Sequence, residues 1–151
     1  MALKGINHVV LKVRDLDRAE QFYRLLGFQR AGTREDLGMR FYFGGGSHHD
    51  LALMGLGTEA PQPARTAVGL FHFCVTVDDE AELARLRSTL ERAGYPVSEG
   101  VDHVVSRSFY TRDPDGNGVE LTWDTPEADW RHLDNPFAVD RAYDIPPAPE
   151  E

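Results

Sequence analysis

The sequence carries one pattern twice, and this repeat restricts the fold more than any other feature. Residues 6–13 alternate in polarity, as expected for a strand, and place His8 on the face opposite a set of apolar residues. Residues 70–77 alternate in the same way and place His72 at the equivalent position. An amphipathic segment and three shorter strand-like segments follow each of them. Two βαβββ modules are therefore expected.

Each predicted helix has a start and a stop signal. The first is expected over residues 16–26 and the second over residues 80–93, where apolar residues recur at helical spacing. An aspartate can cap the start of each helix, and a glycine can end it in a left-handed conformation. These residues are Asp15 and Gly27 for the first helix, and Asp78 or Asp79 and Gly94 for the second.

The remaining strands are short and are separated by polar turns. They are expected at 28–32, 39–43 and 49–54 in the first module, and at 97–98, 106–111 and 118–123 in the second. A turn of sequence DPDGN lies at 113–117, between the last two strands.

These elements predict an α+β fold in which two βαβββ modules pair into a cupped mixed sheet around a metal site, with helices on the outside. The expected domain spans residues 1–124, with module one at 5–55 and module two at 69–124. Residues 125–151 form a C-terminal extension that shows no sign of a regular core of its own.

Composition excludes several classes of partner. The chain has 151 residues and a formal net charge of -9, which repels phosphate backbones, so nucleic acid is not expected to bind. No window approaches eighteen apolar residues and the start lacks a leader-like apolar stretch, so we expect no membrane association. Cys74 is the only cysteine, which fits a cytoplasmic location.

Three polar side chains share the face that each module turns away from its helix. They are His8, His72 and Glu120, the last of which alternates with apolar neighbours in its strand. Two imidazoles and one carboxylate that leave open positions form the facial triad used by non-haem iron(II). The alternative is that these histidines are structural residues with no metal to bind.

Several motifs resemble the vicinal oxygen chelate superfamily, which includes glyoxalase I, bleomycin resistance proteins and type I extradiol dioxygenases. They are INHVVL at 6–11, FHF at 71–73, YTRDPDGN at 110–117 and VEL at 119–121. HHDLAL at 48–53, together with DH at 102–103 and SRSFY at 106–110, resembles the catechol 2,3-dioxygenase branch. The resemblance covers about residues 5–124.

The resemblance implies a site and a reaction. His8, His72 and Glu120 would bind Fe(II), with Mn, Zn or Ni as other possible metals. His49 would act as the acid/base and Tyr110 would hydrogen-bond the substrate. Strand alternation leaves open whether His48 or His49 faces the site. His48 is the alternative to His49 and is expected to contact the substrate. His103, seven residues before Tyr110, is expected to contact the substrate as well.

The resemblance implies an oxidoreductase: an extradiol dioxygenase that cleaves the ring of a catechol-type small molecule with dioxygen. Such a reaction belongs to the degradation of aromatic compounds. We also expect a homodimer. The alternatives are another metal-dependent lyase, isomerase or transferase of the superfamily, or a metal-free binding protein of the bleomycin resistance kind. Glyoxalases place a second Glu ligand in the first module, but alignment of the two repeats puts Ala52 there. Isomerisation of methylglyoxal is therefore disfavoured, unless two chains share a site and donate ligands to each other.

Overall fold

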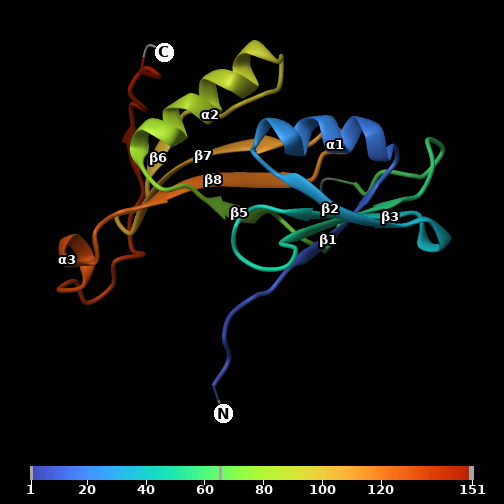
Figure 1. The fold of residues 1–151 in the computed structure, drawn as a ribbon. Coiled ribbons are helices and arrows are strands. Elements are labelled where there is room, and N and C mark those ends of the chain that lie inside the picture. The colour runs from blue at the N-terminus through green and yellow to red at the C-terminus, as the bar shows by residue number, and fades with distance from the viewer. Residues whose placement is uncertain (1, 65, 150–151) are drawn as a thin grey trace. The chain divides into compact units, whose positions relative to one another are not determined.

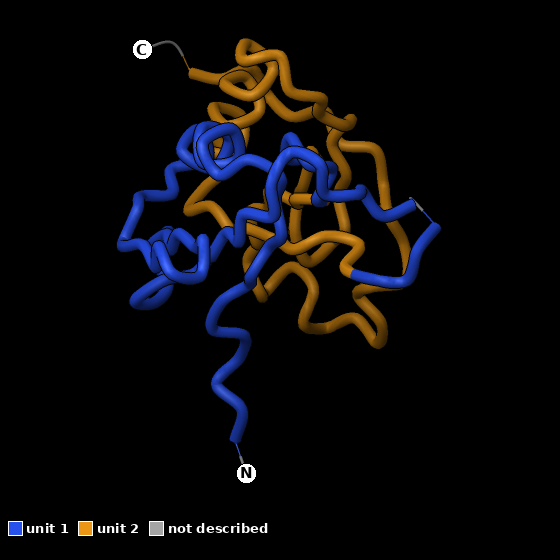
Figure 2. Tube along the Cα trace, turned by 90° about the vertical axis from the view of Figure 1, so that its right-hand side faces the viewer, with its two compact units in different colours: residues 1–69, 113–117 blue, residues 70–112, 118–151 orange. Residues whose placement is uncertain are grey.

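The computed structural model describes residues 2–64 and 66–149, and it divides into two compact units. Unit 1 comprises residues 1–69 and 113–117, and unit 2 comprises residues 70–112 and 118–151 (Figure 2). No helix in the described part of the chain combines the length and apolar character needed to span a bilayer.

Unit 1 contains a four-stranded mixed sheet with the order β1-β4-β3-β2. Figure 1 labels β1, β2 and β3 of this sheet and helix α1. Strand β1 runs parallel to β4, and the other neighbours are antiparallel. The elements are β1 (Val9–Val13), α1 (Leu16–Leu25), β2 (Gln29–Arg34), the short 3-10 helix η1 (Glu35–Leu37), β3 (Met39–Phe43) and β4 (Leu51–Gly55).

Unit 2 contains a five-stranded mixed sheet with the order β5-β8-β7-β6-β9. Its first strand again runs parallel to the last strand of the module. The elements are β5 (Phe73–Thr76), α2 (Glu80–Arg92), β6 (Gly100–Asp102), β7 (Ser106–Arg112), β8 (Gly118–Asp124), α3 (Glu127–Trp130) and β9 (Arg141–Tyr143). Both modules thus share one strand order, first-fourth-third-second, which confirms the predicted repeat and the α+β class.

The helices form where the sequence places them, and for the predicted reasons. The Asp15 carboxylate accepts hydrogen bonds from the first turn of α1, and Asp79 caps α2 in the same way. Gly27 and Gly94 follow the two helices with φ of +94° and +79°, in the region that favours glycine. The predicted apolar stripes are buried, except that Ala93 beyond the end of α2 is exposed.

Strand ends and the C-terminal extension differ from the prediction. Strands β1 and β5 begin one residue after His8 and His72, so both histidines lie at strand entrances. The second strand of the second module, expected at 97–98, forms instead at Gly100–Asp102, and Val97 makes an isolated bridge to Thr111. The extension is not without regular structure: it contains α3, and β9 joins the sheet beside β6.

One charged residue lies within the buried face of α1. Glu20 is 7% exposed, and its carboxylate accepts hydrogen bonds from Arg40 (2.7 Å) and Tyr42 (3.0 Å) and from Arg30. Because these donors come from β2 and β3, they compensate a charge that would otherwise be costly to bury.

Protonation of Glu20 in acid should lower the stability of the protein. Burial raises the pKa of Glu20, but the hydrogen bonds from Arg30 and Tyr42 outweigh it, so the net pKa is below its usual value. A lowered folded-state pKa stabilises the fold above the unfolded value of about 4.3, and this contribution is lost as pH falls through the folded-state pKa. We expect Glu20→Gln to flatten the fall in unfolding free energy between about pH 5 and pH 3, measured by urea denaturation. Glu99→Gln, which changes an exposed glutamate, should leave that fall unchanged.

Candidate active site

Three strands of unit 2 bring polar side chains into one row across the sheet. Glu120 on β8 pairs with Cys74 on β5 and with Tyr110 on β7. Residues paired across neighbouring strands point to the same face, and their Cβ atoms lie about 4.5–5.5 Å apart. His72 enters from the same face because it precedes Cys74 by two residues.

His72 and Glu120 face each other directly. His72 Nε2 lies 3.0 Å from Glu120 Oε2, and the Glu120 side chain is 11% exposed. Within unit 2, the ion-pair partners of Glu120 are His72 and His103, and neither carries a permanent charge. A buried carboxylate in such surroundings calls for a cation.

His103 and Tyr110 extend this cluster. His103 Nε2 lies 2.8 Å from the Tyr110 hydroxyl and 3.7 Å from Glu120 Oε1. The rings of His72 and Tyr110 pack edge to face with their centroids 5.5 Å apart. Burial raises the pKa of Tyr110, and the negative charge of Glu120 raises it further. The Tyr110 hydroxyl therefore keeps its proton at neutral pH and remains a hydrogen-bond donor.

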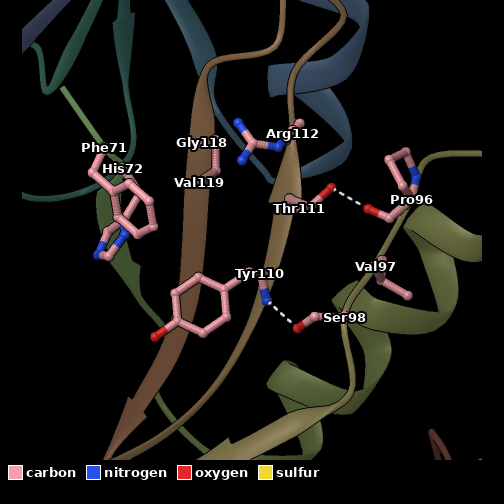
Figure 3. Close-up of a pocket in the computed structure, with 10 residues that line it drawn as sticks. All are labelled: Phe71, His72, Pro96, Val97, Ser98, Tyr110, Thr111, Arg112, Gly118 and Val119. Atoms are coloured by element: carbon pink, nitrogen blue, oxygen red, sulfur yellow. Dashed lines mark hydrogen bonds between the residues drawn. The ribbon is translucent and has the colours of Figure 1, made fainter. Parts of the chain in front are cut away.

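A cavity of about 450 Å³ opens beside this cluster (Figure 3). His72 and Tyr110 line it, and Phe71, Pro96 and Val97 contribute apolar walls. Its volume is within the range of small-molecule pockets, about 300–1,000 Å³. An apolar cavity with a few convergent polar groups suits a small ligand that is mostly hydrocarbon.

The other predicted histidines gather in unit 1. The His8 and His49 rings lie 4.5 Å apart between centroids, and His48 Nδ1 lies 2.6 Å from His49 Nδ1. Burial lowers the pKa of His49, and the neighbouring His8 and His48 lower it further. His49 is thus biased toward the neutral imidazole, which can accept a proton.

The loop before β4 positions His48 and His49. The Asp50 carboxylate accepts hydrogen bonds from the amides of Gly44 (2.7 Å) and Gly46 (3.3 Å), which closes the loop. A Cβ at Gly46 would lie 2.7 Å from the Asp50 carboxylate, so a larger residue there would displace the Asp50 side chain that closes the loop. Because both histidines precede the strand, alternation along β4 does not decide which of them faces a ligand.

Strand pairing also identifies the counterpart of Glu120 in unit 1. Ala52 pairs with Val10, two residues after His8, just as Glu120 pairs with Cys74, two residues after His72. The predicted equivalence of Ala52 and Glu120 is confirmed. Ala52 is fully buried and has no donor atom, so the first module offers a histidine without a carboxylate at the matching place.

The donor atoms of His72 and Glu120 fit a divalent metal. Two donors that bind one ion at right angles lie about 3 Å apart, close to the 3.0 Å observed. Across residues 2–64 and 66–149, no three or more His, Cys, Asp or Glu side chains are grouped as a complete metal site. The structure thus brings together two of the three predicted ligands, and the role of His8 stays a prediction.

One polar residue near the cluster was not predicted. Asp140 Oδ1 lies 2.6 Å from His103 Nδ1, on the side of the ring away from Tyr110. Asp140 belongs to the C-terminal extension, where residues 141–143 show no alternation from which a strand could be predicted.

Comparisons with known proteins give matches over most of the chain. Residues 5–121 match the Glyoxalase/Bleomycin resistance protein/Dioxygenase superfamily. The catechol-2,3-dioxygenase of Bacillus subtilis (strain 168) is 32% identical over 130 residues, which cover 83% of this chain and 44% of that protein. This chain therefore spans less than half the length of that relative. Biphenyl-2,3-diol 1,2-dioxygenase 3 of Rhodococcus globerulus is 33% identical over 154 residues, covering 90% of this chain and 80% of the relative.

Solved structures give the same fold. The lactoylglutathione lyase from Agrobacterium tumefaciens is 30% identical with a TM-score of 0.62, and the match covers 82% of this chain and 96% of that one. A glyoxylase/bleomycin resistance protein/dioxygenase domain from Frankia sp. EAN1pec has a TM-score of 0.68 at 23% identity. This match covers 82% of this chain and 100% of that one. The relatives thus include proteins named for two different reactions.

Proposed function

The chain belongs to the glyoxalase/bleomycin resistance protein/dioxygenase superfamily, and from this premise we propose that it is an iron(II)-dependent extradiol dioxygenase that acts on a catechol-type small molecule. The curated relatives named above are dioxygenases of aromatic diols. One observation carries the proposal: His72 Nε2 lies 3.0 Å from the buried carboxylate of Glu120, beside a largely apolar cavity.

Each residue has a proposed role in this reaction. His72 and Glu120 hold the metal, together with His8 as the third ligand predicted from the sequence. Bound iron(II) supplies the redox chemistry that allows dioxygen to react with the aromatic ring. Tyr110 keeps its proton and donates a hydrogen bond to a substrate oxygen. His49, biased toward its neutral form, acts as the acid/base.

The apolar walls of the cavity support an aromatic substrate. Phe71, Pro96 and Val97 offer surfaces on which a flat ring can pack. Arg112 also lines the cavity and brings a positive charge to walls that are otherwise largely apolar (Figure 3).

The second candidate is a lyase or isomerase that works without oxygen, favoured by the structural likeness to lactoylglutathione lyase. Ala52 weakens this candidate, since it removes the carboxylate that a second matching half-site would supply. The buried Glu120 argues against a metal-free binding protein. Its ion-pair partners in unit 2 are His72 and His103, and neither has a permanent positive charge that would compensate the carboxylate.

The test is to purify the chain anaerobically, load it with iron(II), and follow oxygen uptake with catechol and biphenyl-2,3-diol. We expect about one iron per chain and uptake that depends on the diol. His72→Ala should remove both, whereas His132→Ala, which changes an exposed histidine of the extension, should keep both.

Other outcomes would point to other functions. Tight binding of zinc, nickel or manganese with no diol-dependent uptake would favour the lyase or isomerase. A chain that binds no divalent metal at all would favour the binding protein.

A further inference from the structure

His103 is held between the C-terminal extension and the candidate active site. Its Nδ1 lies 2.6 Å from the Asp140 carboxylate, and its Nε2 lies 2.8 Å from the Tyr110 hydroxyl. The three side chains form a continuous hydrogen-bonded chain that ends beside Glu120. All of them belong to unit 2.

The hydrogen-bonding groups of Asp140, His103 and Tyr110 determine which ring nitrogen of His103 carries a proton. An ionised carboxylate only accepts hydrogen bonds, so His103 Nδ1 must be the donor to Asp140. In the neutral ring Nε2 is then an acceptor, and it faces the Tyr110 hydroxyl. Asp140 thereby sets both the orientation of the ring and the direction in which Tyr110 and His103 share a proton.

The turn that carries His103 is strained. Val104, the next residue, has φ of 73°, a left-handed conformation that β-branched residues rarely adopt. The Asp102 carboxylate accepts from the Val104 amide at 2.7 Å, and Thr125 Oγ1 donates to the Val104 carbonyl at 2.7 Å. Strain that surrounding contacts maintain often marks a functional position. Here it fixes the residue adjacent to His103.

The extension is built into the sheet at the place that Asp140 requires. Strand β9 pairs with β6 in a register that sets Arg141 opposite Asp102, so Asp140 comes next to His103. A Cβ at Gly100 would lie 2.3 Å from the Tyr143 carbonyl, so glycine is what allows β9 to approach. The Tyr143 hydroxyl hydrogen-bonds Glu80, and the Arg107 guanidinium lies 4.8 Å from the Tyr143 ring centroid.

We propose that Asp140 is a positioning residue of the active site, which holds His103 with Nδ1 protonated and Nε2 directed at Tyr110. The inference rests on the proposed function for its catalytic meaning, because His103 and Tyr110 would then act on a bound diol. The C-terminal extension then contributes a positioning residue to the active site.

The test begins with the metal-free full-length chain, so that it does not depend on the proposed reaction. Imidazole ¹⁵N chemical shifts report which ring nitrogen of His103 is protonated, and His103→Gln assigns the signals. We expect a protonated Nδ1 in the wild type. In Asp140→Ala, which removes the acceptor, the Nδ1 proton should be lost in favour of an Nε2–H tautomer. Asp144→Asn changes an exposed aspartate just after β9 and should leave the spectrum unchanged.

Kinetics on the iron-loaded enzyme give the second measurement. Asp140→Ala should lower kcat about 10-fold with KM changed by less than about 2-fold, the effect typical of partners behind an active-site imidazole. Asp140→Glu should restore at least half of the activity, because Asp140 is 67% exposed and leaves room for a longer carboxylate.

The outcomes separate the two proposals. A His103 tautomer that is identical in the wild type and Asp140→Ala overturns the positioning role, whatever the activity. A tautomer that depends on Asp140 in a chain without diol-dependent oxygen uptake supports the positioning pair and removes the dioxygenase assignment. A loss of kcat that Asp144→Asn shares would also count against Asp140.

Discussion

Glu120→Gln is expected to reduce iron(II) affinity by more than about 100-fold and to abolish diol-dependent oxygen uptake. Glutamine has nearly the same shape but no negative charge, and a divalent cation binds carboxylate oxygens far better than amide oxygens. Loss of a partner behind a ligand already costs about 10–100-fold, so loss of the ligand charge should cost more. Anaerobic competition with a metal indicator and an oxygen electrode give the two readouts.

The same substitution should not destabilise the metal-free chain. Glu120 is buried against His72 and His103, and neither of these carries a permanent charge that would compensate the carboxylate. Removing such a charge is neutral or stabilising. We therefore expect the unfolding free energy of metal-free Glu120→Gln to equal or exceed that of the wild type, while added iron(II) stabilises only the wild type.

Weaker iron(II) binding without a loss of stability in the metal-free chain distinguishes a functional carboxylate from a structural one. If Glu120→Gln unfolds more readily without metal and binds iron(II) normally, Glu120 is a structural residue and the proposed metal site is wrong. Glu99→Gln, at an exposed position, should change neither quantity.

The repeat made much of the fold predictable. Its strands and helices depend on local signals, such as the alternation around His8 and His72 and the caps at Asp15 and Asp79. The equivalence of Ala52 and Glu120 could also be predicted, because a duplicated module keeps its strand register. These features depend on period and spacing, which a sequence displays directly.

Other features depend on contacts that no local pattern encodes. Strand β9 is only three residues long, and it forms because Gly100 admits it beside β6. The positions of His48 and His49 follow from the loop closed by Asp50, where strand alternation has no meaning. Asp140 could not be linked to His103 because 37 residues separate them.

Glu20 illustrates the same limit within a helix that was otherwise predicted correctly. Helical periodicity reports which residues share a face, and a glutamate on that face would ordinarily be assigned to the solvent. Its donors are Arg40 and Tyr42 on β3 and Arg30 on β2. Only the pairing of these strands brings them to α1, so the burial of Glu20 is a property of the fold.

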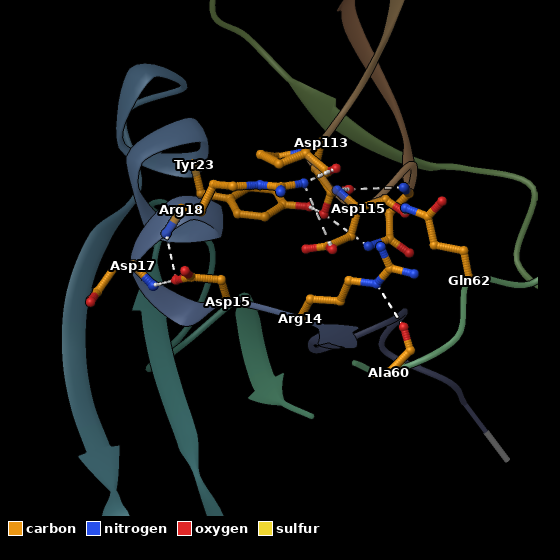
Figure 4. A network of polar contacts seen from close by, with 11 residues as sticks. Arg14, Asp15, Asp17, Arg18, Tyr23, Ala60, Gln62, Asp113 and Asp115 are labelled. Atoms are coloured by element: carbon orange, nitrogen blue, oxygen red, sulfur yellow. Dashed lines mark hydrogen bonds and ion pairs between the residues drawn. The ribbon is translucent and has the colours of Figure 1, made fainter. Parts of the chain in front are cut away.

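The second large effect is expected at the DPDGN turn, which belongs to unit 1. Asp113 is 4% exposed, and its carboxylate accepts from the amides of Asp115 (2.9 Å) and Asn117 (2.8 Å) and from the Asn117 side chain (2.8 Å). It also accepts from the hydroxyl of Tyr23 on α1, at 2.9 Å (Figure 4). Tyr23 is fully buried, so its hydroxyl is hydrogen-bonded to protein and not to bulk water.

Asp113→Ala should therefore lower the unfolding free energy by about 3 kcal/mol or more, since each buried donor left without a partner costs about 1–3 kcal/mol. Tyr23→Phe, which removes one donor and leaves the turn intact, should cost about 1 kcal/mol. Both values come from urea denaturation at neutral pH.

Asp115, two residues along the same turn, provides the matched control. Its side chain is 6% exposed, neither carboxylate oxygen has a hydrogen-bond partner among the described residues, and Arg18 lies 3.9 Å away. Because the buried Asp115 carboxylate accepts no hydrogen bond from the described residues and its ion pair with Arg18 is long, Asp115→Ala should be neutral or stabilising. Equal losses in the Asp113 and Asp115 variants would mean that the turn responds to any shortened side chain. A large loss in Asp113→Ala alone would show that its hydrogen bonds stabilise the turn against α1.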